Sequence, residues 1–135
     1  MNKIEHIGIA VKDIRESNSL FEKIFNKPNY KIEEVTTEGV ITSFFKVGET
    51  KIELLQASSP DSPIAKFIKD RGEGVHHIAF EVDDIDSEIQ RLLTAGFEVI
   101  NKESKDGADN KKISFLHPKS TNGVLIELCQ EKSDK

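Results

Sequence analysis

The sequence predicts an α+β fold built from two repeated β-α-β-β-β modules, because three patterns occur twice in its 135 residues. HIGIAVKDI at 6–14 resembles HIAFEVDDI at 77–85, so each half begins with an apolar segment headed by His-Ile. KIELLQ at 51–56 resembles LIELCQ at 125–130, so each half ends on Ile-Glu-Leu. Between these segments, each half carries one helical pattern followed by short strand patterns, which is typical of an internal structural repeat.

The first module is expected to begin with a strand at 4–11 and to continue with a helix. The helix is predicted because apolar residues recur at roughly helical spacing: Ile14, Phe21, Ile24 and Phe25. Asp13 precedes this stripe and is a suitable N-cap, since its carboxylate can accept from the first free backbone N–H groups. The remaining strands of the module are expected near 30–36, 40–47 and 50–56.

The second module repeats this order, beginning with a strand at 77–82. Its helix is predicted from a second apolar stripe: Ile85, Ile89, Leu92 and Leu93. Asp84 is the expected N-cap, and Gly96 is the expected stop. The remaining strands are expected near 97–103, 111–117 and 123–129.

The segment at 57–74 links the modules and is predicted to contain one short helix. Pro60 and Pro63 mark its start, IAKFIK has a helical pattern, and Gly72 and Gly74 end it. The linker is too short for two independent domains, so we expect one domain over 1–130, with modules at about 4–56 and 75–130. Residues 131–135 are expected to form a solvated tail.

The composition is that of a soluble globular protein, with 36% hydrophobic and 32% charged residues. A formal net charge of −5 argues against binding along a nucleic-acid backbone. The single cysteine, Cys129, cannot form an internal disulfide, which fits a reducing compartment. The sequence shows neither a signal-peptide pattern nor an apolar run of membrane-spanning length, so a cytoplasmic location is expected.

The adjacent histidines of GVHHIAF raise the question of which one faces a site, because neighbouring side chains on a strand point to opposite faces. The repeat aligns His6 with His77, and it aligns Glu5 with His76. A charged residue at the position equivalent to His76 indicates that position 76 tolerates charge and faces outward. His77 is therefore the histidine expected to face a site, together with His6.

Glu53 and Glu127 are also repeat-equivalent, and each lies in an otherwise apolar strand. A glutamate is costly to bury there unless it is paired or coordinates a metal, although a single glutamate on the wet face of a half-covered sheet is the more common case. Two histidines and two glutamates at matched positions favour a borderline divalent ion such as Zn, Co, Ni, Mn or Fe. Cys129 shares a face with Glu127 and is expected to be a small apolar filler. His117 is expected to be structural or adjacent to a bound ligand, and not to bind the metal.

Paired β-α-β-β-β modules with His in the first strand and Glu in the last resemble the vicinal oxygen chelate, or glyoxalase/bleomycin resistance, superfamily. The segments VGETKIELL, DSPIAKFI, RGEGVHHIAFEVDDI and KKISFLHPKSTNGVLIEL resemble the methylmalonyl-CoA epimerase family within it. The similarity covers about residues 4 to 130, and DSPIAKFI and FLHPKSTNGVLIEL are its most specific parts.

The resemblance implies a cupped, mostly antiparallel sheet around one divalent metal ion, such as Co, Mn, Zn or Ni, held by His6, Glu53, His77 and Glu127. It implies an enzyme that interconverts (2R)- and (2S)-methylmalonyl-CoA through a metal-stabilised enolate, in propionate metabolism. Glu127 is the first choice for a proton-transfer group and Glu53 a weaker one, because a coordinated carboxylate is a poorer base. A homodimer and a small acyl-CoA substrate are also implied.

Two positions depart from the family pattern. Some epimerases carry a catalytic Glu three residues after a Gly, where this chain has Thr42, which leaves the second proton-transfer group unidentified. The family often has Gly-Gly before the Lys-Lys pair, where this chain has Asp109 and Asn110, two residues that tolerate left-handed turns. Thr42 is expected to contact the substrate. The phosphates of CoA are expected to meet basic residues near FLHPKS, unless these are ordinary surface lysines: Lys111, Lys112 and Lys119.

Three other functions fit the same fold, so the fold does not decide between them. A glyoxalase I-like lyase would act on a glutathione hemithioacetal with the same kind of metal site. An extradiol-type dioxygenase would hold Fe(II) with two His and one Glu, and the extra carboxylate of Glu53 argues against it. A non-catalytic small-molecule-binding protein would have lost a metal ligand, and all four ligands are present.

Overall fold

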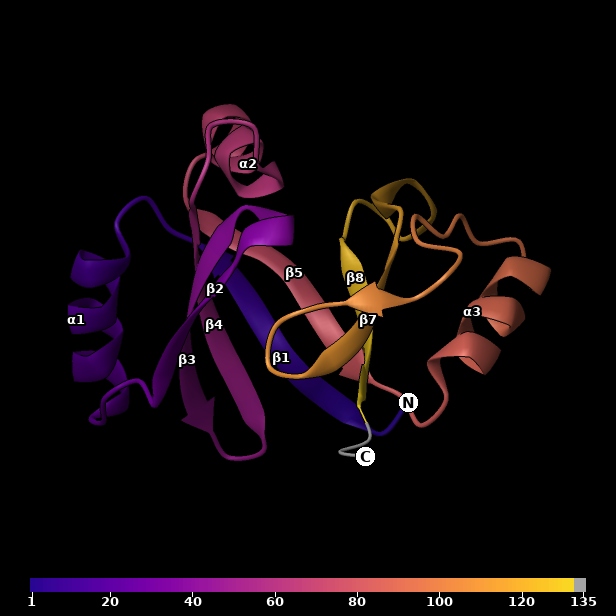
Figure 1. Cartoon of the computed structure of the whole chain (residues 1–135), viewed down its shortest axis with the longest axis horizontal. Coiled ribbons are helices and arrows are strands. Elements are labelled where there is room, and N and C mark those ends of the chain that lie inside the picture. Colours follow the sequence, from indigo (N-terminus) through magenta and orange to yellow (C-terminus); the bar gives the residue numbers. More distant parts are fainter. Residues whose placement is uncertain (133–135) are drawn as a thin grey trace. The chain divides into compact units, whose positions relative to one another are not determined.

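The computed structural model describes residues 1–132, and it divides the chain into two compact units. The N-terminal unit is His6–His76, and the C-terminal unit combines Met1–Glu5 with the chain from His77 onward. Strands β1 (Lys3–Ala10) and β5 (Gly74–Glu81) are each divided between the units, directly before His6 and directly before His77. The predicted α+β fold of two β-α-β-β-β modules is confirmed (Figure 1).

The N-terminal unit holds its strands in the order β2-β3-β4-β1. β4 runs parallel to β1, whereas the other neighbouring strands of the unit are antiparallel. The elements that follow β1 in this unit are α1 (Ile14–Phe25), β2 (Lys31–Val35), η1 (Thr36–Glu38), β3 (Val40–Val47), β4 (Thr50–Ala57) and α2 (Pro63–Arg71). Each predicted strand of the first module is present, within one residue at each end.

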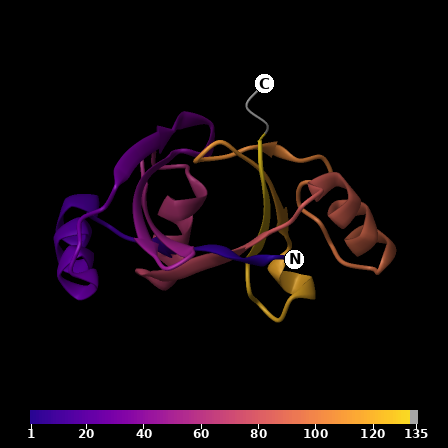
Figure 2. The ribbon, with the colours of Figure 1, turned by 90° about the horizontal axis from the view of Figure 1, so that it is seen from below.

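Helices α1 and α2 lie on opposite faces of these strands (Figure 2). On the α1 face, Phe45 and Leu54 are fully buried beside Ile14, with Phe21 and Phe25 of the helix packed against them. On the other face, the α2 residue Ile64 packs with another buried group: Ala10, Val40 and Leu55. The predicted linker helix therefore packs against the first module.

The C-terminal unit has the strand order β5-β8-β7-β6, again with one parallel pair, β5 and β8. Its further elements are α3 (Ile85–Thr94), β6 (Lys105–Asp106), β7 (Lys111–Leu116), η2 (Pro118–Ser120) and β8 (Ile126–Glu131). Helix α3 covers one face of this sheet, where its apolar stripe packs against Leu116 and Leu128. Within each unit most strand pairs are antiparallel, as predicted.

Both module helices begin in the same way. Asp13 accepts from the N–H groups of Arg15 and Glu16, and Asp84 accepts from that of Ser87, so both predicted N-caps are confirmed. The glutamines that close the repeated IELLQ and IELCQ segments add a second matched contact. Gln56 Oε1 accepts from the Ile14 N–H at 2.8 Å, and Gln130 Oε1 accepts from the Ile85 N–H at 2.8 Å.

The strand predicted at 97–103 is wrong. This segment forms only a bridge between Val99 and Leu116, and the next strand, β6, is two residues long. The reason is Asn101, whose side-chain Oδ1 accepts from the Phe115 N–H at 3.0 Å while its carbonyl accepts from Ser114 Oγ at 2.7 Å. Backbone hydrogen bonds join this segment to β7 as far as the Ile100 N–H and the Phe115 carbonyl, and beyond that point the Asn101 contacts interrupt the regular ladder.

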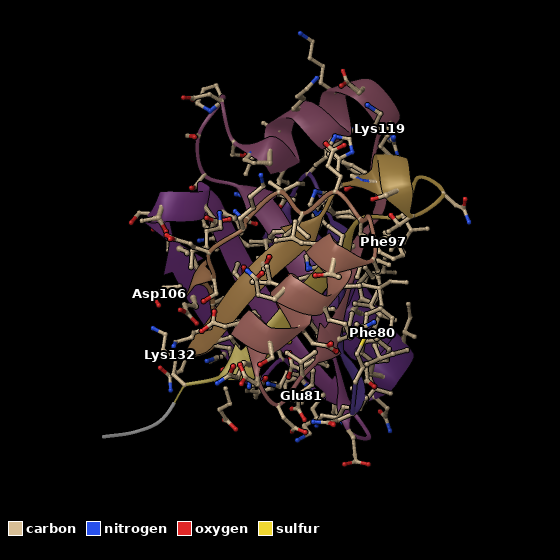
Figure 3. The ribbon with its side chains drawn as sticks, turned by 90° about the vertical axis from the view of Figure 1, so that its right-hand side faces the viewer. Phe80, Glu81, Phe97, Asp106, Lys119 and Lys132 are labelled. Atoms are coloured by element: carbon tan, nitrogen blue, oxygen red, sulfur yellow. The ribbon has the colours of Figure 1, made fainter. Side chains whose placement is uncertain are left out.

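The turn before β7 has the geometry that its residues allow, since Asp109 and Asn110 both have φ near +60°. Asp106 and Lys132 close this end of the unit with an ion pair of 2.9 Å (Figure 3). Strand β8 extends to Glu131, so the predicted tail begins inside a strand, and residues 133–135 lie outside the described residues.

Among the described helices, none combines the length and hydropathy needed to span a bilayer.

The Asp84 cap makes a testable prediction about acid stability. The Ser87 N–H and then the Ser87 hydroxyl bind its carboxylate and hold its pKa below the ordinary value of 3.8. A lowered pKa in the folded state means that the stabilisation is present above pH 3.8 and is lost as the pH falls through the folded pKa. We expect Asp84→Asn to destabilise the protein at pH 7 in urea unfolding, and the gap to wild type to close below pH 4. A gap that does not change with pH would contradict this role of the charge.

Candidate active site

A buried His–Glu pair lies on the strand face of the N-terminal unit that α1 does not cover. In the parallel register of β1 and β4, Gly8 is opposite Glu53, so His6, two residues earlier, projects from the same face as Glu53. His6 Nδ1 lies 3.2 Å from Glu53 Oε2, and the residues are 5% and 4% exposed. The repeat selected these two residues, and the strand register brings them into contact within the first module.

The C-terminal unit contains the equivalent pair. Ala79 is opposite Glu127 in the parallel register of β5 and β8, and His77 lies two residues before Ala79 on the same face. His77 Nε2 lies 2.9 Å from Glu127 Oε1, and the residues are 6% and 5% exposed. The two modules therefore position the four predicted ligands by the same strand register.

The chemistry of these pairs suits a metal ion. A buried carboxylate is costly without a partner, and here each has an imidazole at hydrogen-bond distance. Two ligand atoms bound about 2.1 Å from one zinc-like ion are about 3.0–3.4 Å apart in octahedral or tetrahedral geometry. The observed separations of 3.2 and 2.9 Å are close to that spacing, so either pair can supply two ligands with little rearrangement.

Each pair also faces a phenylalanine that sequence reasoning missed. Phe44 is opposite Glu53 in β3, and Phe115 is opposite Glu127 in β7. The Phe115 ring packs edge-on against the His77 ring, with centroids 5.7 Å apart and an interplanar angle of 85°. A second Ser-Phe repeat, SFF at 43–45 and SFL at 114–116, was the available signal.

His76 lies on the opposite strand face from His77, as predicted. Its ring packs edge-on against the Phe67 ring of α2, with the ring centroids 5.0 Å apart. The reason given for the assignment of His76, a solvent-facing Glu5, is wrong, because Glu5 is only 2% exposed. Its carboxylate lies within 4.8 Å of Cys129 Sγ in the C-terminal unit. The repeat correctly paired these positions, but a repeat carries no information about what covers the far face of a strand.

Thr42 is 1% exposed and projects from the same face as Glu53, two residues from Phe44. Cys129 is fully buried, as predicted, and its Sγ lies 3.6 Å from the Phe80 carbonyl oxygen. His117 Nδ1 accepts from the Lys119 N–H at 3.0 Å at the start of η2, which is a structural contact.

The three lysines predicted to meet phosphates are not gathered on one surface of the C-terminal unit. Lys111 shares the face of Glu127, is buried, and lies 3.7 Å from Glu131. Lys112 projects from the opposite face, where its charge contributes to the lowered pKa of Asp84. Lys119 is exposed on η2 (Figure 3).

The sequence matches the model of the glyoxalase/bleomycin resistance protein/dioxygenase superfamily over residues 5–115. It is 38% identical over 135 residues to an uncharacterized protein of Bacillus subtilis (strain 168), covering 100% of this chain and 96% of the other. It is 40% identical to the mitochondrial methylmalonyl-CoA epimerase of Dictyostelium discoideum, covering 95% of this chain and 78% of that protein.

A solved epimerase structure has the same fold as this chain. A single-substitution variant of Streptomyces coelicolor methylmalonyl-CoA epimerase, in complex with 2-nitronate-propionyl-CoA, superimposes with a TM-score of 0.94 at 31% identity. The match covers 98% of this chain and 96% of that structure. The chain therefore belongs to the glyoxalase/bleomycin resistance protein/dioxygenase superfamily, within the branch that includes methylmalonyl-CoA epimerases.

Proposed function

We propose that this protein is a metal-dependent epimerase that interconverts (2R)- and (2S)-methylmalonyl-CoA. The observation that carries the proposal is the pair of equivalent, buried His–Glu contacts, in a chain whose relatives include methylmalonyl-CoA epimerases. The likeness to a structure in complex with an acyl-CoA analogue supports a CoA thioester as the substrate.

His6, Glu53, His77 and Glu127 are proposed to hold one divalent ion together. Their residue types fit Zn, Co, Mn or Ni, and their matched strand registers support a shared role. Such an ion, when bound, acts as a Lewis acid that stabilises negative charge on the thioester oxygen by several kcal/mol. An imidazole nitrogen whose N–H donates to a glutamate in the metal-free pair must present its lone pair to the ion instead, which a neutral imidazole achieves by carrying its proton on the other ring nitrogen.

Glu127 is proposed to remove the C2 proton of the substrate, and Glu53 remains the weaker choice for this kind of role. The C2–H bond lies between a thioester and a carboxylate, so the electron pair left behind delocalises onto the thioester oxygen. Glu127 is held by His77 and screened from bulk water by burial, so its position is fixed before substrate binds. The homodimer, and a role of Thr42, Lys111, Lys112 and Lys119 in substrate binding, stay predictions.

The first experiment uses the whole chain, stripped of metal with a chelator and then reloaded with Co(II), Mn(II) or Zn(II). One pure epimer of methylmalonyl-CoA is incubated in D2O, and C2 deuteration and epimer formation are followed together. We expect both to require metal, with one ion per chain by elemental analysis. Two ions per chain would contradict a shared ion.

The glyoxalase I-like alternative is tested with the same preparations. Methylglyoxal and glutathione are supplied in place of methylmalonyl-CoA, and formation of the thioester product is followed. Turnover of the hemithioacetal together with no C2 exchange in methylmalonyl-CoA would overturn the epimerase assignment. We expect the opposite result, because DSPIAKFI and FLHPKS are the segments that resemble the epimerases most specifically.

A further inference from the structure

Three lysines project from the face of the N-terminal unit that carries Glu53, one from each of β2, β3 and β4: Lys31, Lys46 and Lys51. Lys46 is directly opposite Lys51, and Lys31 is directly opposite Phe44, which is two residues from Lys46. Residues that are opposite one another share a face, as do residues two apart on one strand. Phe44 is also the residue opposite Glu53, so all three lysines share the face of Glu53.

These lysines form one end of that face, which we call the basic end. Lys51 is the register partner of His6 and is two residues from Glu53, and the pair of Lys46 and Lys51 lies beside the hairpin that joins β3 to β4. At the other end of the face, strand residues pack against Ile64 of α2: Ala10, Val40 and Leu55. The contact between His6 and Glu53 is therefore bordered by an apolar end that α2 covers and by the basic end.

The arrangement of charge at the basic end favours a bound anion. Like charges directly opposite on neighbouring strands repel, so the facing Lys46 and Lys51 carry a cost that an anion between them offsets. Lys46 is exposed and the Lys31 side chain is 38% exposed, so a ligand in solution can reach both. Glu33, on the same face, lies 3.6 Å from Lys31, and its single charge offsets one of the three. A local positive surface of this kind attracts anions even though the whole chain has a net charge of −5.

The number and position of these charges suit the phosphates of coenzyme A, and this choice of ligand rests on the proposed function. The carboxylate of the acyl group carries one charge and lies close to the thioester, whereas Lys46 lies at the exposed edge of the face. The nucleotide end of coenzyme A carries several phosphate charges and is joined to the thioester by a long neutral arm. The lysines that the sequence suggested for this role, in the C-terminal unit, are not gathered on one surface.

We propose that Lys31, Lys46 and Lys51 form the subsite that binds the phosphates of coenzyme A. Each ammonium group donates charge-assisted hydrogen bonds to phosphate oxygens, and the neutral arm runs from the basic end to a thioester beside His6 and Glu53. In this role the lysines hold a part of the substrate that does not react. Their loss is therefore expected to weaken binding without slowing the chemical step, which raises KM and leaves kcat unchanged.

The test compares two double variants of the metal-loaded whole chain that make the same change of charge: Lys46→Gln with Lys51→Gln, and Lys23→Gln with Lys27→Gln. Lys23 and Lys27 are exposed in and directly after α1, which packs on the opposite face of the strands. Lys31 is kept in both, because its Nζ also lies 4.7 Å from the centroid of the Phe44 ring.

Titration calorimetry measures the Kd of coenzyme A, and turnover measures KM and kcat for methylmalonyl-CoA and for methylmalonyl-pantetheine, which lacks the phosphates. We expect the variant of Lys46 and Lys51 to raise the Kd of coenzyme A and the KM of methylmalonyl-CoA by about 10-fold at low salt, and by less at high salt. We expect its KM for methylmalonyl-pantetheine to match that of wild type. The variant of Lys23 and Lys27 is expected to match wild type with both substrates.

An unchanged Kd of coenzyme A, or an equal change in both double variants, would overturn the subsite. An equal rise of KM for methylmalonyl-pantetheine would overturn it as well, because the lysines would then meet the acyl carboxylate. Wild-type protein that binds coenzyme A through these lysines but exchanges no C2 proton would overturn the proposed function alone. Wild-type protein that does not bind coenzyme A would overturn both. Urea unfolding at no lower a concentration than wild type confirms that the variants are folded.

Discussion

Glu127→Gln is expected to lower epimerisation of both epimers, and C2 exchange of the one epimer whose proton Glu127 removes, by about 10²- to 10⁴-fold, the usual contribution of a positioned proton-transfer group. The amide has nearly the shape of the carboxylate and can still accept a hydrogen bond from His77, but it cannot take a proton from C2. Because Glu127 handles one face of the substrate in both directions, inversion of either epimer is expected to fail. The measurement is the deuterium exchange assay on each epimer.

Glu131→Gln is the matched control for this experiment. Glu131 lies on the same strand and projects from the same face, but its side chain is 74% exposed and it is opposite Lys111 rather than Phe115. We expect this variant to retain wild-type exchange. Full activity in Glu127→Gln would show that another group removes the proton and would limit Glu127 to metal binding.

His77→Ala is expected to abolish stoichiometric metal binding and, with it, activity. The loss should exceed the roughly 10- to 100-fold that removal of an outer-shell partner costs, because a direct ligand is deleted. The substitution also removes the imidazole that lies 2.9 Å from the buried Glu127 carboxylate. The free energy of unfolding of the metal-free protein is therefore expected to fall by about 1–3 kcal/mol. Elemental analysis and urea unfolding measure the two effects separately.

The neighbouring histidine gives an unusually close control. His76→Ala removes the same side chain one residue earlier, on the opposite strand face, where the ring contacts Phe67. We expect this variant to keep its metal and its activity, with only the loss of packing against α2. Equal loss of metal in both variants would contradict the assignment of His77 as a ligand.

The local elements could be predicted because their causes are local. Helix boundaries follow from apolar spacing and from an aspartate placed to cap free N–H groups, and both Asp13 and Asp84 form those caps. The strand at 97–103 failed because the side chain of Asn101 competes with the backbone for hydrogen bonds, which periodicity does not register.

The sequence by itself determined the repeat, the choice of His77 over His76, and the four residue types that suit a metal, because strand alternation and repeat equivalence fix which side chains share a face. Only the tertiary structure showed that each histidine contacts the glutamate of its own module, since strand register depends on pairing across about 50 residues of intervening chain. It also decided that Glu5 is buried and that Phe44 and Phe115 lie opposite the two glutamates. Those facts depend on what packs against a strand and on which strand lies beside it, and neither is encoded in the strand's own pattern.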